Sequence, residues 1–298
     1  MAGHKEFDEA TGYHTTGHVW DGDLKELNKP LPKWWLYTFY ACIVWAIGYW
    51  VLYPTWPTAN GYTKGILGYS QRATVTQQVD AAKAAQSKHR TAIEKTALAD
   101  IRKNPELLQF ATAGGKAVFA DNCAPCHGRG AQGSVGYPNL NDDDWIWGGT
   151  IDAIEQTIKG GIRWQGHKET RESAMPRFGL DGLLEPDKIS DTSEYVMSLS
   201  GAKGDAAATE RGKAIFAEQC ASCHGEDGKG NAELGAPNLA DAIWLYGATK
   251  QNIADSIKTG RGGVMPAWGP TKDDPKGRLD IAAIKSLAIY VHSLGGGK

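Results

Sequence analysis

Length, composition and charge narrow the class of protein. The chain has 298 residues, which suggests two modules of ordinary size rather than one. It carries 32 Lys and Arg against 34 Asp and Glu, so the net charge is −2, and nothing globally basic favours nucleic acid as a partner. A mean hydropathy of −0.41 excludes a polytopic membrane protein, and 41% hydrophobic residues exclude wholesale disorder.

The first apolar segment follows a polar arm, residues 1–33. No charged side chain occurs between Lys33 and Lys64, and residues 34–53 read WWLYTFYACIVWAIGYWVLY. Twenty helical residues span about 30 Å, the thickness of the hydrocarbon core of a bilayer. Aromatic side chains gather at both ends, as they do at lipid headgroups. The stretch therefore predicts one retained transmembrane helix over 34–56; a buried helix of a soluble core is the alternative.

Residues 57–112 join this segment to the rest of the chain. Apolar side chains recur at three- to four-residue steps from residue 75 to residue 101, and an Asn-Pro pair then breaks the pattern. We expect one amphipathic helix over about 74–102. Its narrow apolar stripe suits a strut that lies against another subunit. A flexible tether is the alternative.

The remaining sequence is a tandem repeat. The string GKAVFADNCAPCHG returns later as GKAIFAEQCASCHG, MPRFG returns as MPAWG, and EYVMSL near the end of the first copy matches IYVHSL near the end of the second. Duplication of one domain is the simplest explanation, with the two copies at 113–200 and 205–298.

Each copy carries one C-x-x-C-H string. Its two thiols are placed to form thioethers with the vinyl groups of one haem, and the adjacent His then lies under the iron as an axial ligand. The strings are Cys123, Cys126 and His127 in the first copy, and Cys220, Cys223 and His224 in the second. A zinc site would need four clustered ligands, and neither copy offers two further Cys or His at suitable spacing. The sequence predicts two covalently bound haem c groups.

Two methionines are candidates for the sixth iron ligand. Met175 and Met265 both precede a proline, which holds the preceding residue extended, whereas Met197 lies on an expected closing helix and suits packing. Ligation by His and Met gives a six-coordinate haem with a raised reduction potential, which favours electron transfer over binding of oxygen or peroxide. Chain order favours Met175 for the His127 haem. By the same order Met265 serves the His224 haem, but spacing leaves a crossed arrangement open.

Charged residues near these motifs allow two interpretations each. Arg163 and Arg261 precede the Met-Pro motifs and suit pairing with haem propionates, or else solvated surface positions. Residues 113–199 carry 8 Lys and Arg against 13 Asp and Glu, whereas 205–298 has 11 of each. The acidic run 142–144 in the first copy suits either a docking surface for a basic electron donor or a helix-capping loop.

Helical periodicity dominates both copies, and few of their segments are typical of strands. Glycine and proline crowd the loops, which suits backbone that approaches a large flat cofactor. The expected fold is all-α, with one N-terminal transmembrane helix followed by two tandem class I cytochrome c-like domains.

Several segments resemble one protein family. They are EATGYHTTGHVWDGDLKELNKPLPKWWL, YPTWP, GNAELGAPNLADAIWLYG and GRGGVMPAWGP, and they are similar to the dihaem subunit, subunit III, of cbb3-type cytochrome c oxidases. The resemblance implies a subunit anchored in the bacterial inner membrane that relays electrons from a soluble or membrane-bound cytochrome c toward a haem–copper catalytic subunit, beside a monohaem cytochrome c subunit. In that family the catalytic subunit reduces oxygen and pumps protons. The implied ligands are the Cys, His and Met residues already named, and no catalytic residue is implied.

The compartment follows from the chemistry of haem attachment. Attachment to C-x-x-C-H normally occurs outside the cytoplasmic membrane, so we expect the haem domains in the periplasm and residues 1–33 in the cytoplasm. Two other functions stay open. One is an anchored dihaem carrier that serves another periplasmic oxidoreductase, and the other is a dihaem peroxidase, which would need an iron with an open sixth position.

Overall fold

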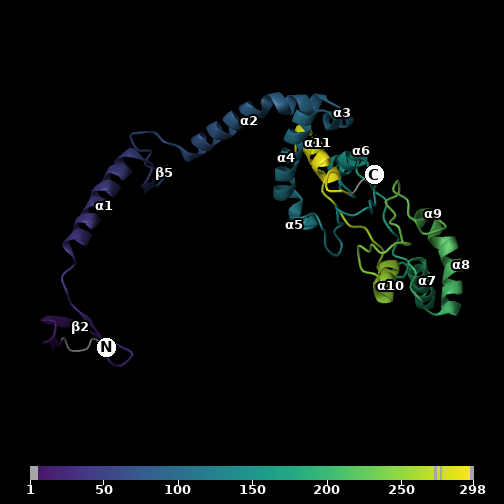
Figure 1. Cartoon of the computed structure of the whole chain (residues 1–298), viewed down its shortest axis with the longest axis horizontal. Helices are drawn as coiled ribbons and strands as arrows, with labels where there is room; N and C mark the ends of the chain where they lie inside the picture. Colours follow the sequence, from purple (N-terminus) through teal and green to yellow (C-terminus); the bar gives the residue numbers. More distant parts are fainter. Residues whose placement is uncertain (1–5, 272–273, 276, 296–298) are drawn as a thin grey trace. The chain divides into compact units, whose positions relative to one another are not determined.

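The computed structural model describes residues 6–271, 274–275 and 277–295. The ends of the predicted arm and of the predicted second haem domain, residues 1–5 and 296–298, lie outside this range. The chain divides into two compact units, Met1–Ala84 and Ala85–Lys298 (Figure 1). The fold is mostly helical, as predicted, with small sheets in the first unit.

A three-stranded antiparallel sheet forms most of the polar arm. It contains β1 (Phe7–Asp8), β2 (Tyr13–Trp20) and β3 (Leu24–Leu27) in that spatial order. Asp21 and Gly22 turn the chain between β2 and β3 with φ values of 50° and 93°, a conformation that Asp and Gly tolerate better than most residues. The all-α expectation therefore does not extend to the arm.

Helix α1 (Lys33–Leu52) corresponds to the predicted membrane segment. It is long and apolar enough to cross a membrane, and none of its residues, all of which the structure describes, is buried within the chain. The helix is shorter than the expected span of 34–56. It ends at Leu52 because Pro54 disfavours helical backbone at the residue before it.

The segment that follows α1 is folded rather than an open linker. Strands β4 (Pro57–Thr58) and β5 (Gly61–Tyr62) form a hairpin. After the hairpin the chain returns to the end of α1, where the amides of Ile66 and Leu67 donate hydrogen bonds to the last carbonyls of that helix.

The single helix predicted over 74–102 is two helices, α2 (Gln71–Lys95) and α3 (Leu98–Lys103). The Lys285 ammonium group donates to three carbonyls where α2 ends, those of Ile93, Glu94 and Thr96, at 3.4, 2.8 and 2.8 Å. Because Lys285 supplies hydrogen-bond donors to these carbonyls, the helix can end there without leaving them unpaired. The sequence pattern of α2 and α3 alone does not contain this contact.

The apolar stripe of α2 and α3 is buried only toward its C-terminal end. Ile93 and Ile101 are fully buried, whereas Val75 and Val79 are 45% and 44% exposed. The buried end packs against the chain's own core rather than being a free tether. Contact of the exposed end with another subunit stays a prediction.

The haem-domain unit continues with helices that mostly begin at a side-chain cap. They are α4 (Pro105–Asn122), α5 (Ala124–His127), α6 (Ile151–Gly160), α7 (Pro186–Leu199), α8 (Ala206–Gln219), α9 (Ala221–His224), α10 (Lys250–Thr259) and α11 (Ile281–His292). Asn104 and Asp205 accept backbone hydrogen bonds at the starts of α4 and α8. Thr150 and Thr249 do the same for α6 and α10. The two copies therefore use matching caps at corresponding helices.

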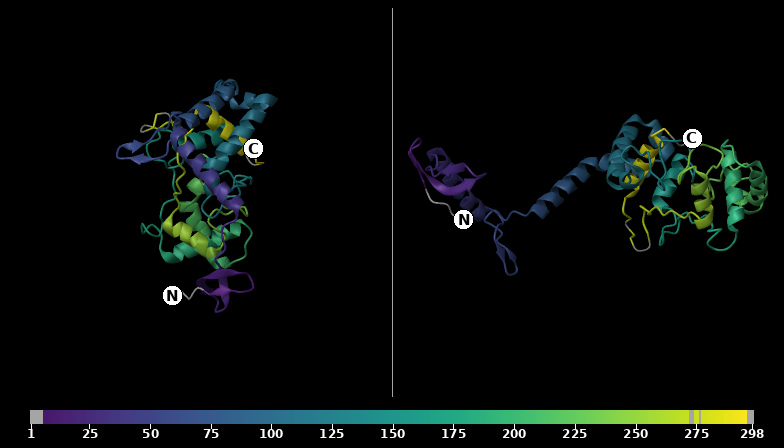
Figure 2. Two further views of the ribbon diagram at one scale, coloured as in Figure 1. Left: turned by 90° about the vertical axis from the view of Figure 1, so that its left-hand side faces the viewer. Right: turned by 90° about the horizontal axis from the view of Figure 1, so that it is seen from below.

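Each hydrophobic core combines helices from both sequence copies. Helix α11 packs on α4 and α6, whereas α7 packs on α8 and α10; Figures 1 and 2 show the yellow α11 against the teal α4. Phe119 and Leu287 lie in the first core, and Val196 and Phe216 lie in the second. The packing therefore differs from the prediction of two contiguous domains at 113–200 and 205–298, because the closing helix of each copy completes the core of the other.

The chain crosses from one hydrophobic core to the other just after α6 and again just after α10. Two antiparallel backbone bridges mark the crossing, Ile162 with Met265 and Met175 with Arg261. Gly161 and Gly260 turn the chain out of the two helices, both with φ of 69°. A Cβ atom on Gly161 would lie 2.6 Å from the Met265 carbonyl oxygen, and one on Gly260 would lie 2.5 Å from that of Met175. Glycine is required at both positions by conformation and by space.

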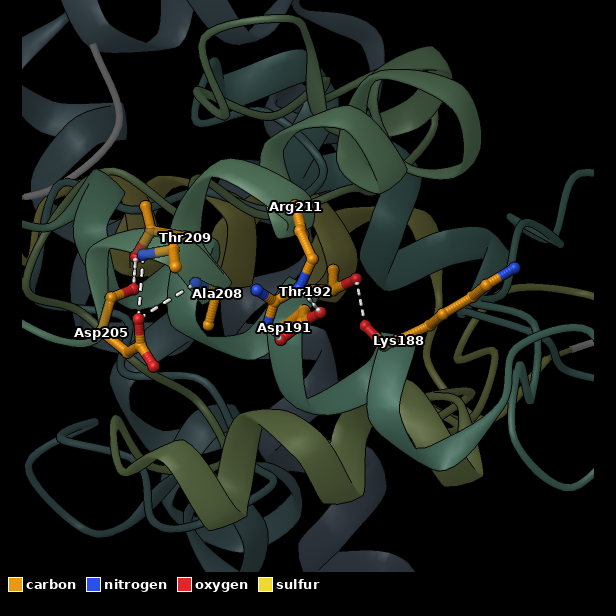
Figure 3. Close-up of polar contacts among 8 residues, drawn as sticks. Lys188, Asp191, Thr192, Asp205, Ala208, Thr209 and Arg211 are labelled. Carbon is orange, nitrogen blue, oxygen red and sulfur yellow. Dashed lines mark hydrogen bonds and ion pairs between the residues drawn. The ribbon is translucent and has the colours of Figure 1, made fainter.

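In both cores the opening and closing helices touch backbone to backbone. A Cβ atom on Gly212 of α8 would lie 2.0 Å from the Asp191 carbonyl oxygen of α7, and one on Gly115 of α4 would lie 2.1 Å from that of Ser286 in α11. Arg211 adds a two-pronged bond to the Asp191 carboxylate at 2.7 and 2.8 Å (Figure 3). The exchanged helix pairs are therefore in close contact over their middle turns.

A pair of adjacent glycines tests the contact between α4 and α11. Gly115→Ala should destabilise the haem-domain unit by about 1–3 kcal/mol, because the added methyl group collides with the Ser286 carbonyl. Gly114→Ala is the matched control, since a Cβ atom there meets nothing within 4 Å. It should stabilise α4 by up to about 1 kcal/mol through helix propensity. Thermal unfolding of the full chain measures both effects, and equal midpoints for the two variants would contradict this packing.

Candidate haem sites

Each C-x-x-C-H string occupies one helical turn at the end of a longer helix. Helix α4 ends at Asn122, and Cys123 lies between it and α5. Helix α8 likewise ends at Gln219, and Cys220 lies between it and α9. The amide of Cys126 donates to the Cys123 carbonyl and the amide of Cys223 donates to that of Cys220, both at 3.1 Å. A helical turn brings the two thiols and the histidine of each string close together.

All the predicted haem residues line one cavity of about 1020 Å³. They are Cys123, Cys126, His127, Met175, Cys220, Cys223, His224 and Met265. Apolar side chains such as Phe119, Phe216 and Trp244 form much of the remaining lining. The structure thus brings together residues that the sequence places in separate motifs and in separate copies.

Both histidines form a hydrogen bond to a backbone carbonyl through one ring nitrogen. Nδ1 of His127 lies 3.0 Å from the Pro138 carbonyl oxygen, and Nδ1 of His224 lies 3.1 Å from that of Pro237. A carbonyl only accepts, so Nδ1 carries the proton and Nε2 is left as the ligand atom. Burial lowers the pKa of both imidazoles. The neutral form, which is the one that binds a metal ion, is therefore favoured.

The two Met-Pro methionines lie in exchanged cores. Met265 packs against the core that contains Cys123, whereas Met175 packs against the core of Phe216, as Cys220 also does. Chain order alone favours the opposite arrangement. The structure instead packs each methionine against the hydrophobic core that contains the opening helix of the other copy, because the chain crosses between the two cores after α6 and α10.

Backbone bonds fix both methionines. The Met265 amide donates to the Ile162 carbonyl, and the Met265 carbonyl accepts from the Ile162 amide, both at 3.0 Å. The Met175 amide donates to the Arg261 carbonyl at 2.9 Å, and its carbonyl accepts from the Arg261 amide at 3.3 Å. The backbone of Met265 is therefore held by the segment before Met175, and the backbone of Met175 is held by the segment before Met265.

Arg163 ties the two methionine segments together with its side chain. Its Nε donates to the Gly263 carbonyl at 2.7 Å, and its Nη1 donates to the Ser173 carbonyl. Each acceptor lies two residues before a Met-Pro methionine. Arg163 has φ of 50°, a left-handed conformation that non-glycine residues adopt infrequently and that concentrates at functional positions.

Arg261, the counterpart of Arg163, contacts Ser256 and Tyr246 with its side chain rather than the Met-Pro segments. Its Nε and Nη2 donate to Ser256 Oγ at 3.0 and 2.8 Å, and its guanidinium lies 4.0 Å from the centroid of the Tyr246 ring. Both arginines line the cavity. Neither is the solvated surface residue of the alternative interpretation, and pairing with propionates stays a prediction.

Two aromatic–glycine contacts that sequence reasoning missed join the copies reciprocally. A Cβ atom on Gly235 would lie 2.2 Å from the ring of Trp147, and one on Gly136 would lie 3.5 Å from the ring of Tyr246. The Gly136 amide also donates to the Leu245 carbonyl at 2.9 Å. The two glycines occupy equivalent positions in the two copies, as do the two aromatic residues, so alignment of the copies could have identified all four. The alignment does not show that each glycine contacts the aromatic residue of the other copy.

Trp145 tests whether the cavity suits haem. Its indole Nε1 is buried and finds no hydrogen-bond partner among the residues that the structure describes. A buried donor without an acceptor is costly, and a haem propionate oxygen is an acceptor of the required kind. With two thiols, a neutral imidazole and a methionine near each string, the residues present fit covalently attached haem.

The acidic run of the first copy does not cap the helix that follows it. Helix α6 is capped by Thr150, and Asp144 lines the cavity. Burial, followed by the charges of Asp241 and Asp142, raises the pKa of Asp144 to about 6. Asp143 is the exposed member of the run. Carboxylates from both copies therefore gather beside the cavity.

Three family models match the chain, one over the N-terminal arm and α1 and one over each of the two sequence copies. Residues 12–60 match the family described as N-terminal domain of cytochrome oxidase-cbb3, FixP. Residues 112–200 match cytochrome c, and residues 207–283 match cytochrome c oxidase, cbb3-type, subunit III. The two cytochrome matches imply haem c binding and follow the sequence copies, although the cores are exchanged between them.

Curated relatives are similar to the chain from end to end. The cbb3-type cytochrome c oxidase subunit FixP of Bradyrhizobium sp. (strain ORS 278) is 53% identical over all of both chains. The subunit CcoP of Azospirillum brasilense is 52% identical over 99% of each chain, and that of Cereibacter sphaeroides is 51% identical over 95% of each. This similarity shows that the chain belongs to the FixP/CcoP family of cbb3-type cytochrome c oxidase subunits.

Proposed function

We propose that the chain is a membrane-anchored dihaem c-type cytochrome that relays electrons from periplasmic cytochrome c donors toward the haem–copper catalytic subunit of a cbb3-type oxidase. The observation that carries the proposal is the single cavity lined by both C-x-x-C-H strings and both Met-Pro methionines. Membership of the FixP/CcoP family and the apolar helix α1 support it. The subunit serves aerobic or microaerobic respiration without making or breaking a bond in a substrate.

The proposed ligand sets are crossed. Cys123 and Cys126 would attach one haem, and His127 and Met265 would hold its iron. Cys220, Cys223, His224 and Met175 form the second set. Support for the pairing comes from the packing of each methionine against the core of the other copy. When bound, haem iron alternates between the ferric and ferrous states and so carries one electron.

The chain's own residues set how such a centre behaves. The carbonyls of Pro138 and Pro237 hold each imidazole through Nδ1, which fixes ring orientation and raises ligand basicity. A methionine ligand and an apolar lining would both raise the reduction potential of a haem held here. Because both sites open into one cavity, exchange of electrons between them is the function that the geometry favours.

A dihaem peroxidase is disfavoured by the same geometry. It would need an iron with an open sixth position, and a methionine packs near each string. An anchored carrier for another oxidoreductase is disfavoured by the relatives. They are named as subunits of cbb3-type oxidases, and the chain is similar to them over nearly their whole length.

The proposed topology is single-pass, in the bacterial inner membrane. The N-terminal arm lies in the cytoplasm and the haem domains lie in the periplasm, because haem attachment to C-x-x-C-H occurs on that side. The proposed partners are the catalytic subunit, the monohaem cytochrome c subunit and a soluble or membrane-bound cytochrome c donor. The acidic first copy, with Asp143 exposed at its surface, suits a basic donor.

Two properties of the purified full chain test the proposed function. After denaturation the polypeptide should still stain for haem, with a mass increased by two covalent haem groups. The reduced native chain should not bind carbon monoxide, because both sixth positions are occupied. Loss of the stain on denaturation would refute covalent attachment. Ready binding of carbon monoxide would instead favour the peroxidase.

The crossed ligand sets are tested by marking one haem. Cys126→Ala leaves one vinyl group conjugated with the first porphyrin, so the α-band of that haem should move to longer wavelength. In this background Met265→Ala should make the marked haem bind carbon monoxide, and Met175→Ala should make the unmarked haem bind it. The opposite assignment would mean that each methionine serves its own copy.

The side chain of Arg163 should support both methionines. Arg163→Gln should lower both haem reduction potentials, because loss of its charge-assisted bonds, worth about 1.5–3 kcal/mol each, loosens both Met-Pro segments. Some of each reduced haem should then bind carbon monoxide. Arg261→Gln is the matched control, because it removes the same charge from the same cavity but no bond to either segment. Equal shifts in the two variants would assign the effect to charge alone.

A further inference from the structure

The end of helix α1 is closed by the chain itself. The last carbonyls of an α-helix normally lack partners within the helix. Here the Ile66 amide donates to the Val51 carbonyl at 3.0 Å, and the Leu67 amide donates to the Leu52 carbonyl at 3.1 Å. The Tyr53 carbonyl accepts from the Thr55 hydroxyl at 2.9 Å. Three carbonyls at this end are therefore satisfied without water.

Gly65 makes this closure possible. It has φ of 69°, and a Cβ atom on it would lie 2.4 Å from the Leu52 carbonyl oxygen. No other residue could turn the chain in this conformation while touching the helix end so closely. The return is therefore built into the sequence by one glycine.

The hairpin between α1 and this return is internally bonded. The Thr63 amide donates to the Trp56 carbonyl at 2.8 Å, and the Thr55 amide donates to the Thr63 carbonyl at 3.3 Å. The Trp56 amide donates to the Thr63 hydroxyl at 3.0 Å. Much of the polar backbone near the helix end thus has partners within the segment.

Aromatic contacts fasten the same segment to the last turns of α1. The rings of Trp50 and Trp56 meet edge to face with centroids 4.8 Å apart, and those of Tyr53 and Tyr69 meet in the same way at 5.6 Å. Edge-to-face pairs of this kind add about 0.5–1.5 kcal/mol beyond burial of their area. The segment and the helix end therefore form one folded piece.

The outer surface of this piece is apolar and almost without charge. Trp56, Tyr62, Ile66 and Leu67 are 51%, 58%, 77% and 57% exposed. Lys64 is the single charged residue in the sequence from 54 to 69, and the long stem of a lysine lets its ammonium group reach water from an apolar surface. Such a surface is costly in bulk water and suits the boundary between lipid headgroups and acyl chains.

We propose that residues 54–69, here named the membrane foot, lie in the lipid headgroup layer at the C-terminal end of α1. Lipid is favoured over a protein partner because the foot is continuous with α1, whose surface is exposed along its whole length. Backbone groups in a bilayer must find partners within the protein, and the foot supplies them to the helix end. The anchor of the chain is therefore a helix together with a folded, lipid-facing base.

Helix α2 marks where this surface stops. It begins at Gln71, and charged residues recur along it at 72, 80, 83 and 88. Charges at this spacing keep a helix out of the acyl-chain region of a bilayer. The first half of α2 is thus an internal aqueous reference for the foot.

Photolabelling from the lipid phase tests the proposal. The full chain is placed in phosphatidylcholine bilayers that contain a few per cent of phosphatidylcholine with an acyl-chain diazirine, and adducts are mapped by peptide mass spectrometry. Residues 62–69 should be labelled within about threefold of the last turns of α1 and at least about tenfold above residues 75–83, as an interfacial depth requires. Adducts confined to α1 would overturn the proposal, whether water or protein covers the foot.

Paired substitutions keep the test independent of labelling chemistry. Ile66→Asn should lower the adduct yield over 62–69 severalfold, because a polar amide draws this part of the foot toward water. Val75→Asn, at another exposed apolar position, should leave that yield unchanged. Both variants retain the backbone bonds at the helix end, and circular dichroism verifies the fold. Equal yields over 62–69 in the two variants would contradict a lipid contact at Ile66.

Discussion

The two backbone bridges between the Met-Pro segments are the constraint on which the rest of the haem-domain unit depends. Because Ile162 pairs with Met265 and Met175 pairs with Arg261, each chain segment must leave its own core after α6 or α10 and enter the other. The closing helices follow, so Leu287 of α11 is buried in the first core and Val196 of α7 in the second. Neither copy can bury its apolar face alone, and the two haem sites are parts of one folded body.

Much of this architecture could be predicted from sequence because its signals are local. The C-x-x-C-H strings, the Met-Pro pairs and the uncharged stretch before Lys64 each specify a structure within a few residues. The exchange of helices could not be predicted, since the periodicity of α7 and α11 shows which faces are apolar but not which helix covers them. The break between α2 and α3 was missed for the same reason, because it depends on Lys285, about 190 residues away.

The candidate haem sites also combine residues that the sequence identifies with residues that it does not. Their ligands carry recognisable side chains, but the residues that position those ligands act through backbone carbonyls and close approach. Arg163 was singled out for its charge, whereas its contacts are with two carbonyls. Gly235 and Gly65 matter because a ring or a helix end touches their Cα atoms, and no pattern in one sequence identifies such contacts. The ligand side chains can be identified from sequence, but the backbone contacts that position them cannot.

Hydrogen exchange in two glycine variants tests the exchange of helices most directly. Gly115→Ala should speed amide exchange in α4 and α11 while leaving α7 and α8 unchanged, and Gly212→Ala should do the reverse, because each methyl group opens only the core that it enters. Faster exchange in α7 on Gly115→Ala, with α11 protected, would show that each copy folds on itself and would contradict the crossed structure.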